Sequence, residues 1–270
     1  MPDRNEWDFP NDATPTGSAG YYVARFSPPE QRNSVARWLA WFAQIDQIAE
    51  KANDPGVARL KLDWWREEIQ FIKNQQARHP IAIAISHEQI SDWQLTQMQL
   101  ALDAIEQRIL KQPAKTLEEF LQQCTDQTGS RTILLAQSSE QQIQSQAKRL
   151  GCYIASIQRL QLVGRDVRHG YLSLPRDLLH QNNISVAQLE ELAPLPALKQ
   201  LAESILEPQE QQLLQQLPDM RQHSELHAPL RLAAQSYQLS RLMRRQQFAC
   251  NQKLFNLSPL RLLWSAWRMR

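Results

Sequence analysis

Apolar residues recur at the period of an α-helix along nearly the whole chain, and this pattern restricts the possible folds more than any other feature. The first long stripe holds Val35, Trp38, Leu39, Phe42 and Ile45, the spacing of an amphipathic helix. No segment alternates apolar and polar residues for long enough to predict a strand. Glycine, which sheets use at turns and bulges, occurs only 7 times in 270 residues. The sequence therefore predicts an all-α fold.

Capping and helix-breaking residues divide this pattern into separate helices. Ser27, followed by Pro28 and Pro29, predicts a helix start, and Thr116 with Glu119 predicts a capping box. Further helices are expected over about residues 57–73, 80–87, 91–109, 116–138, 140–166, 185–192, 196–216, 228–249 and 258–268. We expect residues 1–20 to form a flexible arm and residues 21–270 to form a single helical domain.

Charge and cysteine content exclude several classes of protein. A net charge of only +2 argues against nucleic-acid binding, which normally requires a basic field. The 3 cysteines are far apart and odd in number, so we expect a reducing, cytoplasmic environment. The sequence contains no run of about 20 apolar residues, so we expect no membrane span. The polar residues 1–15 do not resemble a signal peptide.

Two carboxylates occupy unusual positions on the first long helix. Asp46 falls within the apolar stripe, and Glu50 lies one turn further on at its edge. A carboxylate on an apolar face is unfavourable unless it is paired or bound to a metal. A divalent cation between Asp46 and Glu50 would satisfy both, and so would an ion pair between Asp46 and an arginine of another helix. The residues alone leave both interpretations open.

A second acidic position lies near the end of the helix expected over residues 140–166. Asp166 shares a face with Leu162 and is flanked by Arg165 and Arg168. This arrangement fits either a functional carboxylate or a local ion network at the helix C-terminus, where arginines favour the dipole. The same face continues through small residues, which indicate close packing or a cavity wall: Gly151, Cys152 and Ala155.

The last residues of the chain combine apolar, basic and tryptophan side chains. Residues 260–270 contain Trp264 and Trp267 among leucines and arginines. One interpretation is a terminal helix that docks on the core and buries both tryptophans. The other is a helix that lies on a membrane surface.

Taken in order, several segments resemble the squalene/phytoene synthase family of isoprenoid synthases. The most specific is the segment from Asp166 to Pro175, Asp-Val-Arg-His-Gly-Tyr-Leu-Ser-Leu-Pro, which looks like the end of the second acidic motif of that family. The other matching segments are Tyr21 to Phe26, Leu60 to Glu68, His79-Pro80, Thr128 to Ser130, and Ser258 to Leu260.

The resemblance implies the isoprenoid (terpenoid) synthase fold, a single helical domain around a central cavity. In that family two aspartate-rich motifs hold Mg²⁺, which neutralises a diphosphate as its C–O bond breaks. The matching catalytic and metal-binding positions here are Asp46, Glu50 and Asp166. The resemblance places substrate binding at Tyr22, Arg25, Gly129, Ser130, Arg165, Arg168 and Tyr171.

Several acidic positions of the family are replaced in this chain. The first motif, Asp-Asp-x-x-Asp in the family, reads Asp46-Gln47-Ile48-Ala49-Glu50. The second, Asp-x-x-x-Asp, begins with Leu162 and has Arg165 where a glutamate is usual. A Mg²⁺ cluster is therefore expected to be weak or absent. Arg165 and Arg168 suit direct contact with a phosphate instead.

Two functional hypotheses follow from this resemblance. The first is a non-catalytic relative in a bacterium, a pseudoenzyme resembling the branch that includes the mitochondrial complex I assembly factor. It would bind a prenyl diphosphate or polyprenyl lipid, lie peripherally at the inner membrane and act with a membrane-complex partner. The second is an active Mg²⁺-dependent prenyltransferase that condenses farnesyl or geranylgeranyl diphosphate. Leu162 and Arg165 at the metal positions favour the first.

Overall fold

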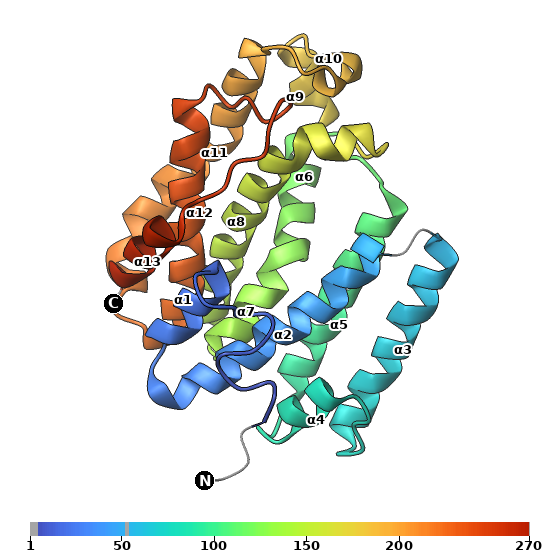
Figure 1. Ribbon diagram of the computed structural model, residues 1–270, viewed down its shortest axis with the longest axis vertical. Helices are drawn as coiled ribbons and strands as arrows, with labels where there is room; N and C mark the ends of the chain where they lie inside the picture. Colours follow the sequence, from blue (N-terminus) through green and yellow to red (C-terminus); the bar gives the residue numbers. More distant parts are fainter. Residues whose placement is uncertain (1–4, 52–53, 270) are drawn as a thin grey trace.

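The computed structural model describes residues 5–51 and 54–269, and every regular element in these ranges is helical. The prediction of an all-α fold is confirmed (Figure 1). No helix in the described ranges is long and apolar enough to cross a bilayer. The helices are α1 (Ala19–Phe26), α2 (Pro29–Lys51), α3 (Pro55–Lys73), α4 (Pro80–Ser86), α5 (Asp92–Leu110), α6 (Leu117–Cys124), α7 (Ser130–Ala136), α8 (Gln141–Arg168), α9 (Arg176–Gln181), α10 (Val186–Glu190), α11 (Pro196–Met220), α12 (His227–Arg245) and α13 (Pro259–Trp267).

Local capping explains where several helices begin. The Asp54 carboxylate accepts the backbone N–H of Gly56 at 2.6 Å and starts α3. The hydroxyl of Thr116 accepts the Glu119 N–H at 3.2 Å and starts α6. Side-chain caps of this kind satisfy N–H groups that have no partner inside the helix.

The predicted role of Ser27 is wrong. Its hydroxyl donates to the Val23 carbonyl at 2.9 Å, and Ser27 caps the C-terminus of α1 rather than the start of α2. The sequence analysis assigned no helix to residues 19–26, where α1 lies, or to residues 176–181, where α9 lies.

The helix predicted over residues 116–138 is divided by one π-helical turn, Thr125–Gly129, between α6 and α7. This turn packs against α8 where two glycines meet. A Cβ atom on Gly151 would lie 2.7 Å from the Gly129 Cα atom and 2.6 Å from the Thr132 hydroxyl. The small residues on α8 therefore serve close helix packing here, which was one of the two roles expected for them.

The core consists of two clusters of buried side chains that meet along α7, which contributes residues to both. One cluster is built around α8, α11 and α12, and the other around α2, α3, α4 and α5. Figure 1 shows α8 running through the middle of the molecule, with α11 and α12 on one side and α5 and α3 on the other. The largest buried side chains of the second cluster, Trp38 and Trp41, lie on the stripe side of α2.

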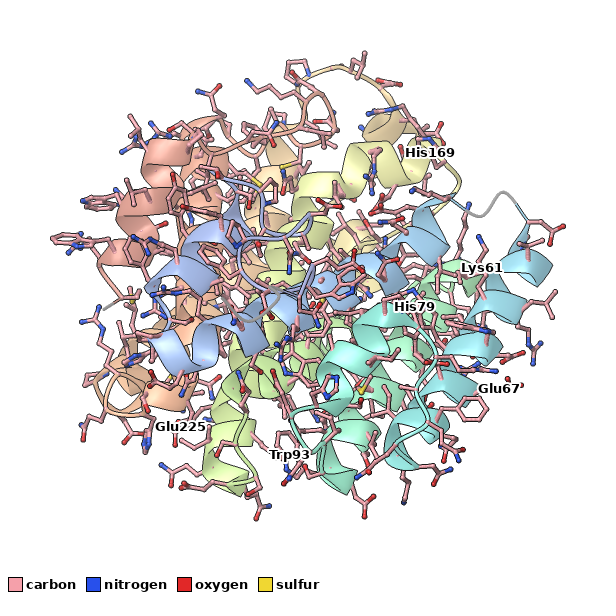
Figure 2. The ribbon with its side chains drawn as sticks, turned by 60° about the horizontal axis from the view of Figure 1, so that its bottom comes forward. Lys61, Glu67, His79, Trp93, His169 and Glu225 are labelled. Atoms are coloured by element: carbon pink, nitrogen blue, oxygen red, sulfur yellow. The ribbon has the colours of Figure 1, made fainter. Side chains whose placement is uncertain are left out.

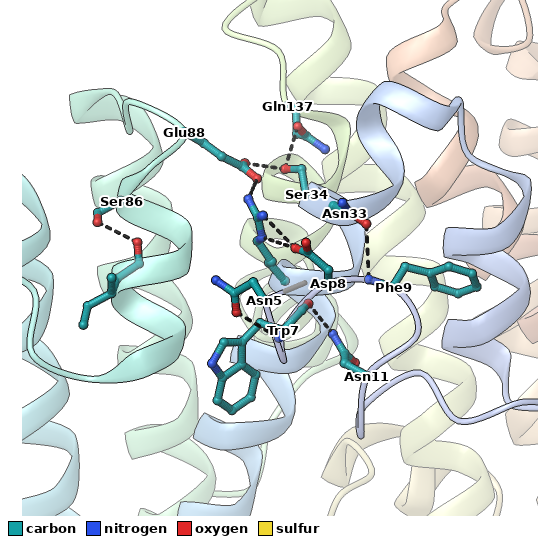
Figure 3. A network of polar contacts seen from close by, with 12 residues as sticks. Asn5, Trp7, Asp8, Phe9, Asn11, Asn33, Ser34, Ser86, Glu88 and Gln137 are labelled. Atoms are coloured by element: carbon teal, nitrogen blue, oxygen red, sulfur yellow. Dashed lines mark hydrogen bonds and ion pairs between the residues drawn. The ribbon is translucent and has the colours of Figure 1, made fainter. Parts of the chain in front are cut away.

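Residues 5–18, which we expected to belong to a flexible arm, are held against α2. Asp8 forms an ion pair with Arg37 at 2.6 Å, and Arg37 also contacts Glu88 at 2.7 Å. The side chains of Trp7 and Phe9 pack on the second core cluster. Figure 3 shows this polar network joining the N-terminal segment, α2 and the residues after α4.

The last helix, α13, turns its small residues inward. Ser265 and Ala266 are buried, whereas Trp264 is 46% and Trp267 is 52% exposed. The helix docks on α1 and α12, as one interpretation expected, but the expected burial of both tryptophans is wrong.

Candidate functional site

A polar cavity of about 810 Å³ opens at the boundary between the two core clusters. This volume is within the range of sites for small organic ligands. Residues from α2, α3, α5, α7 and α8 contribute to its wall, together with the residues just after α8. The lining consists of Asp46, Ala49, Glu50, Pro55, Ala58, Arg108, Ile109, Lys111, Gln127, Arg131, Gln158, Arg159, Leu162, Arg165, Asp166, His169 and Tyr171.

Asp46 is clamped by two arginines from other helices. The two guanidinium nitrogens of Arg131 donate to its two carboxylate oxygens at 2.7 and 2.8 Å. Arg108 of α5 donates to one of these oxygens at 3.3 Å. Burial by itself would raise the pKa of Asp46, but the two arginines outweigh it and hold this pKa below its usual value. The ion-pair interpretation of Asp46 is therefore confirmed.

Asp166 lies in the same cavity but is less well compensated. Its carboxylate accepts from the guanidinium of Arg165 at 3.1 Å. Burial raises the pKa of Asp166 above its usual value, and the charge of Arg165 offsets only part of that effect. Arg165, in the position where the family usually has a glutamate, thus pairs with the acidic residue next to it without fully compensating its burial.

Arg159 is the most unusual charge in the cavity. Its side chain is on the α8 face that also carries Asp166, and the residue is only 7% exposed. It donates to two neutral amide oxygens, of Gln127 at 3.0 Å and of Gln123 at 2.8 Å. Among the described residues it forms no ion pair with a carboxylate within 4.0 Å. The charge of Arg159 helps to lower the pKa of Asp166, but no carboxylate of the described residues bonds to it directly. An anionic ligand beside this buried cation would therefore be stabilised.

The remaining charged side chains make the cavity cationic. Lys111, which directly follows α5, donates to the backbone carbonyl of His169 at 2.8 Å. This hydrogen bond ties the end of α5 to the residues just after α8. His169, labelled in Figure 2, directly follows α8. In all, 5 lysine and arginine side chains face 3 carboxylates across the lining.

The acidic residues present do not fit a Mg²⁺ cluster. Mg²⁺ requires free carboxylate oxygens in octahedral geometry, whereas both oxygens of Asp46 accept guanidinium hydrogen bonds. In the described ranges, no three His, Cys, Asp or Glu side chains lie close enough together to hold a metal ion.

The cavity brings together five of the residues that the sequence marked as functional. Asp46, Glu50, Asp166, Arg165 and Tyr171 all contribute to its wall. Their roles in binding stay predictions.

Five other predicted site residues lie outside the lining. Tyr22 and Arg25 lie on α1, where Tyr22 stacks with Phe26. Gly129 and Ser130 are buried, with Gly129 against α8. Arg168 donates to the backbone carbonyl of Asn251 at 3.0 Å, which ties α8 to the segment before α13. Gly129 and Arg168 therefore have structural roles in this protein, in helix packing and in holding the segment before α13.

Sequence reasoning gave no role in the site to three arginines that line the cavity: Arg108, Arg131 and Arg159. The sequence positions of two of them could have indicated a role in the site. Arg131 directly follows the Gly129-Ser130 pair, and Arg159 is seven residues before Asp166 on the same helix face. The sequence gives no such indication for Arg108, because its segment has the pattern of an ordinary amphipathic helix.

Comparison of the whole structure with solved structures defines the class of the fold. A dehydrosqualene synthase crystallised with a ligand superposes with a TM-score of 0.79 at 18% identity, covering 93% of this chain and 90% of that one. The squalene synthase HpnC from Alicyclobacillus acidocaldarius gives 0.72 at 14% identity, covering 84% and 88%. YisP from Bacillus subtilis gives 0.63 at 14% identity, covering 92% and 89%. The fold is therefore that of the all-α isoprenoid synthases.

The sequence places the protein more narrowly. The family model for squalene/phytoene synthase matches residues 14–268. The chain belongs to the squalene/phytoene synthase family, as the resemblance of its motifs indicates. A comparison with curated proteins gives no match.

Proposed function

We propose that this protein binds a prenyl diphosphate or a similar anionic polyprenyl lipid, and that arginines rather than Mg²⁺ hold the anionic group. Metal-dependent condensation is weakened or lost, and the protein serves a non-catalytic role in the assembly of a membrane complex. The observation that carries this proposal is the clamp of Arg131 and Arg108 on Asp46, because it occupies the surviving aspartate of the first motif.

The charge around the cavity supports direct recognition of an anion. Guanidinium groups form forked hydrogen bonds with phosphate oxygens. Arg159 offers a buried cation that forms no ion pair within 4.0 Å with a carboxylate of the described residues. Family membership supports an isoprenoid chain on the anion, since the family acts in isoprenoid metabolism.

An Asp46→Asn substitution tests the proposal most directly. It weakens the hold of Asp46 on Arg131 and Arg108 and frees both guanidiniums for the ligand. We expect farnesyl diphosphate to bind the variant more tightly than the unaltered protein in the presence of EDTA, as measured by isothermal titration calorimetry. Arg131→Gln should weaken binding about ten-fold or more, since it removes charge-assisted hydrogen bonds.

Arg149→Gln is the matched control for this experiment. Arg149 is an exposed residue of α8 that does not line the cavity, so its loss changes net charge equally without altering the site. Farnesol, which lacks the diphosphate, should bind far more weakly than farnesyl diphosphate. Binding that occurs only with Mg²⁺, or that Asp46→Asn abolishes, would contradict the proposal.

The second candidate is an active Mg²⁺-dependent prenyltransferase. It is favoured by one observation, that Asp46, Glu50 and Asp166 all line the same cavity. For this function the ligand would have to displace Arg131 and Arg108 from Asp46 before metal could bind. Release of pyrophosphate from farnesyl or geranylgeranyl diphosphate with Mg²⁺, lost in Asp46→Asn, would establish this alternative.

A further inference from the structure

The two ends of the sequence differ sharply in charge, although the whole chain carries a net charge of only +2. After Glu225 the chain contains no aspartate or glutamate, but it contains 8 lysines and arginines. The residues up to Glu225 hold 22 lysines and arginines against 28 acidic residues. The part of the chain that forms α12 and α13 is therefore cationic, and the rest is acidic.

Several of these cations lie together on the surface and have no acidic partner. Arg241 and Arg245 of α12 and Arg261 of α13 line one hollow of about 260 Å³, together with Trp264. All three arginines are exposed. In the described part of the chain, none of the three forms an ion pair, whereas Arg244 next to them is paired with Glu210 at 2.8 Å. The hollow is thus a cluster of uncompensated positive charge.

Large apolar side chains project from the same region. Leu260 is 75%, Trp264 46% and Trp267 52% exposed. Their spacing of four and then three residues places them on one face of α13. The opposite face carries the buried Ser265 and Ala266. Exposed apolar residues in such a row are unusual on a surface that contacts only water.

An apolar groove joins this helix to the cationic hollow. It has a volume of about 240 Å³, and its wall includes Leu214, Leu217, Tyr237 and Trp264. Arg241 and Trp264 belong to both depressions. The one carboxylate in the groove, Glu210, is neutralised by Arg244 and accepts a hydrogen bond from the Tyr153 hydroxyl at 2.8 Å. Apolar and cationic surface therefore adjoin without free negative charge.

We propose that this α12–α13 face, defined by Leu260, Trp264, Trp267, Arg241, Arg245 and Arg261, docks on the surface of an anionic lipid bilayer. The tryptophans and Leu260 enter the boundary between headgroups and acyl chains, where indole rings are favoured. The arginines contact lipid phosphates. A second copy of the chain would place the same cations against each other in a symmetric dimer, and a nucleic acid would leave Leu260 unexplained. This proposal does not rest on the function proposed for the cavity.

Vesicle binding of the full chain tests the charge component. We expect the protein to sediment with vesicles of phosphatidylcholine mixed with phosphatidylglycerol, and only weakly with phosphatidylcholine alone. Each arginine that contacts the surface contributes about five-fold to binding, so Arg245→Gln/Arg261→Gln should weaken it about 25-fold. The matched control is Arg59→Gln/Lys61→Gln on α3, on the opposite side of the molecule in Figure 1, and it should retain binding.

Quenching of tryptophan fluorescence tests insertion. Phosphatidylglycerol with brominated acyl chains should quench the tryptophan fluorescence of the protein. The double variant Trp264→Phe/Trp267→Phe should lose most of that quenching, and circular dichroism should show that it remains folded. Equal binding to both kinds of vesicle, equal loss in the α3 control, or binding without quenching would overturn the proposal. In the last case, competition by duplex DNA would reassign the face to a soluble polyanion.

Discussion

Asp46 and Asp166 line one cavity, yet their surroundings shift their pKa values in opposite directions. The pKa of Asp46 is lowered because Arg131 and Arg108 outweigh the effect of burial. The pKa of Asp166 is raised because burial outweighs Arg165. The ionised form of Asp46 therefore stabilises the fold at neutral pH, and the ionised form of Asp166 destabilises it.

Substituting each aspartate by asparagine should separate these effects. We expect Asp46→Asn to lower the free energy of unfolding by about 1–3 kcal/mol, since charge-assisted hydrogen bonds are lost. This corresponds to a few degrees of melting temperature for each kcal/mol. Asp166→Asn should leave the melting temperature unchanged or raise it.

The direction of the pKa shift of Asp46 also predicts how its contribution to stability depends on pH. The stabilisation by Asp46 is fully present above its unfolded pKa, near about pH 4, and is lost as the pH falls through its lower folded pKa. The deficit of Asp46→Asn should therefore shrink below about pH 4. Thermal melts followed by circular dichroism at several pH values measure it. Equal destabilisation by Asp46→Asn and Asp166→Asn would show that the two carboxylates do not have opposite effects on stability.

At the scale of elements, α8 depends on glycine at two close approaches. Gly151 meets the π turn at Gly129, and Gly164 meets the backbone of Asn251, whose Cα atom would lie 2.6 Å from an added Cβ. Asn251 in turn donates to the carbonyls of Glu191 and Ala193 at 3.0 and 2.7 Å. The Gly151 contact positions the π turn, whose Gln127 lines the cavity, and the Gly164 contact positions the segment after α12.

Gly151→Ala tests this packing, because helix propensity and contact predict opposite signs. Propensity alone would stabilise a helix by about 0.5–1 kcal/mol. The close contact with Gly129 should instead destabilise the protein by about 1–3 kcal/mol, since backbone atoms must move. Urea unfolding measures the difference, with the exposed Ser145→Ala on α8 as control. A stabilised Gly151→Ala would refute the contact argument.

At the scale of the whole molecule, the cavity lies where the two core clusters meet. Its wall takes residues from α2, α3 and α5 on one side and from α8 on the other. A ligand that contacts both sides binds only when they are assembled, so it should raise the stability of the whole domain.

Arg159→Gln tests this coupling and the role of the unpaired cation together. The free variant should melt at the same temperature as the unaltered protein or higher, because a buried cation that forms no direct ion pair among the described residues is removed. At a concentration of farnesyl diphosphate about 100 times its Kd, the unaltered protein should gain about 2.7 kcal/mol, and the variant much less. Differential scanning calorimetry in EDTA measures both. A large loss of stability in the free variant, or an undiminished ligand effect, would contradict this account.

The sequence predicted most of the helices because long amphipathic stripes are local patterns. The stripe of α2 and the cap at Thr116 needed only neighbouring residues. It did not reveal α1 or α9, or the π turn, which is a single turn that packs on Gly151. The exposure of Trp264 and Trp267 also depends on which face of α13 meets the core.

By itself the sequence determined the all-α class, the family, and the two acidic positions whose neighbours have been replaced. Only the tertiary structure decided what those positions contact. Arg108 and Arg131 lie 62 and 85 residues from Asp46 along the chain, so no local pattern joins them to it. Helix periodicity is fixed by adjacent residues, whereas the charge balance of a cavity is a sum over helices that meet only when the chain is folded.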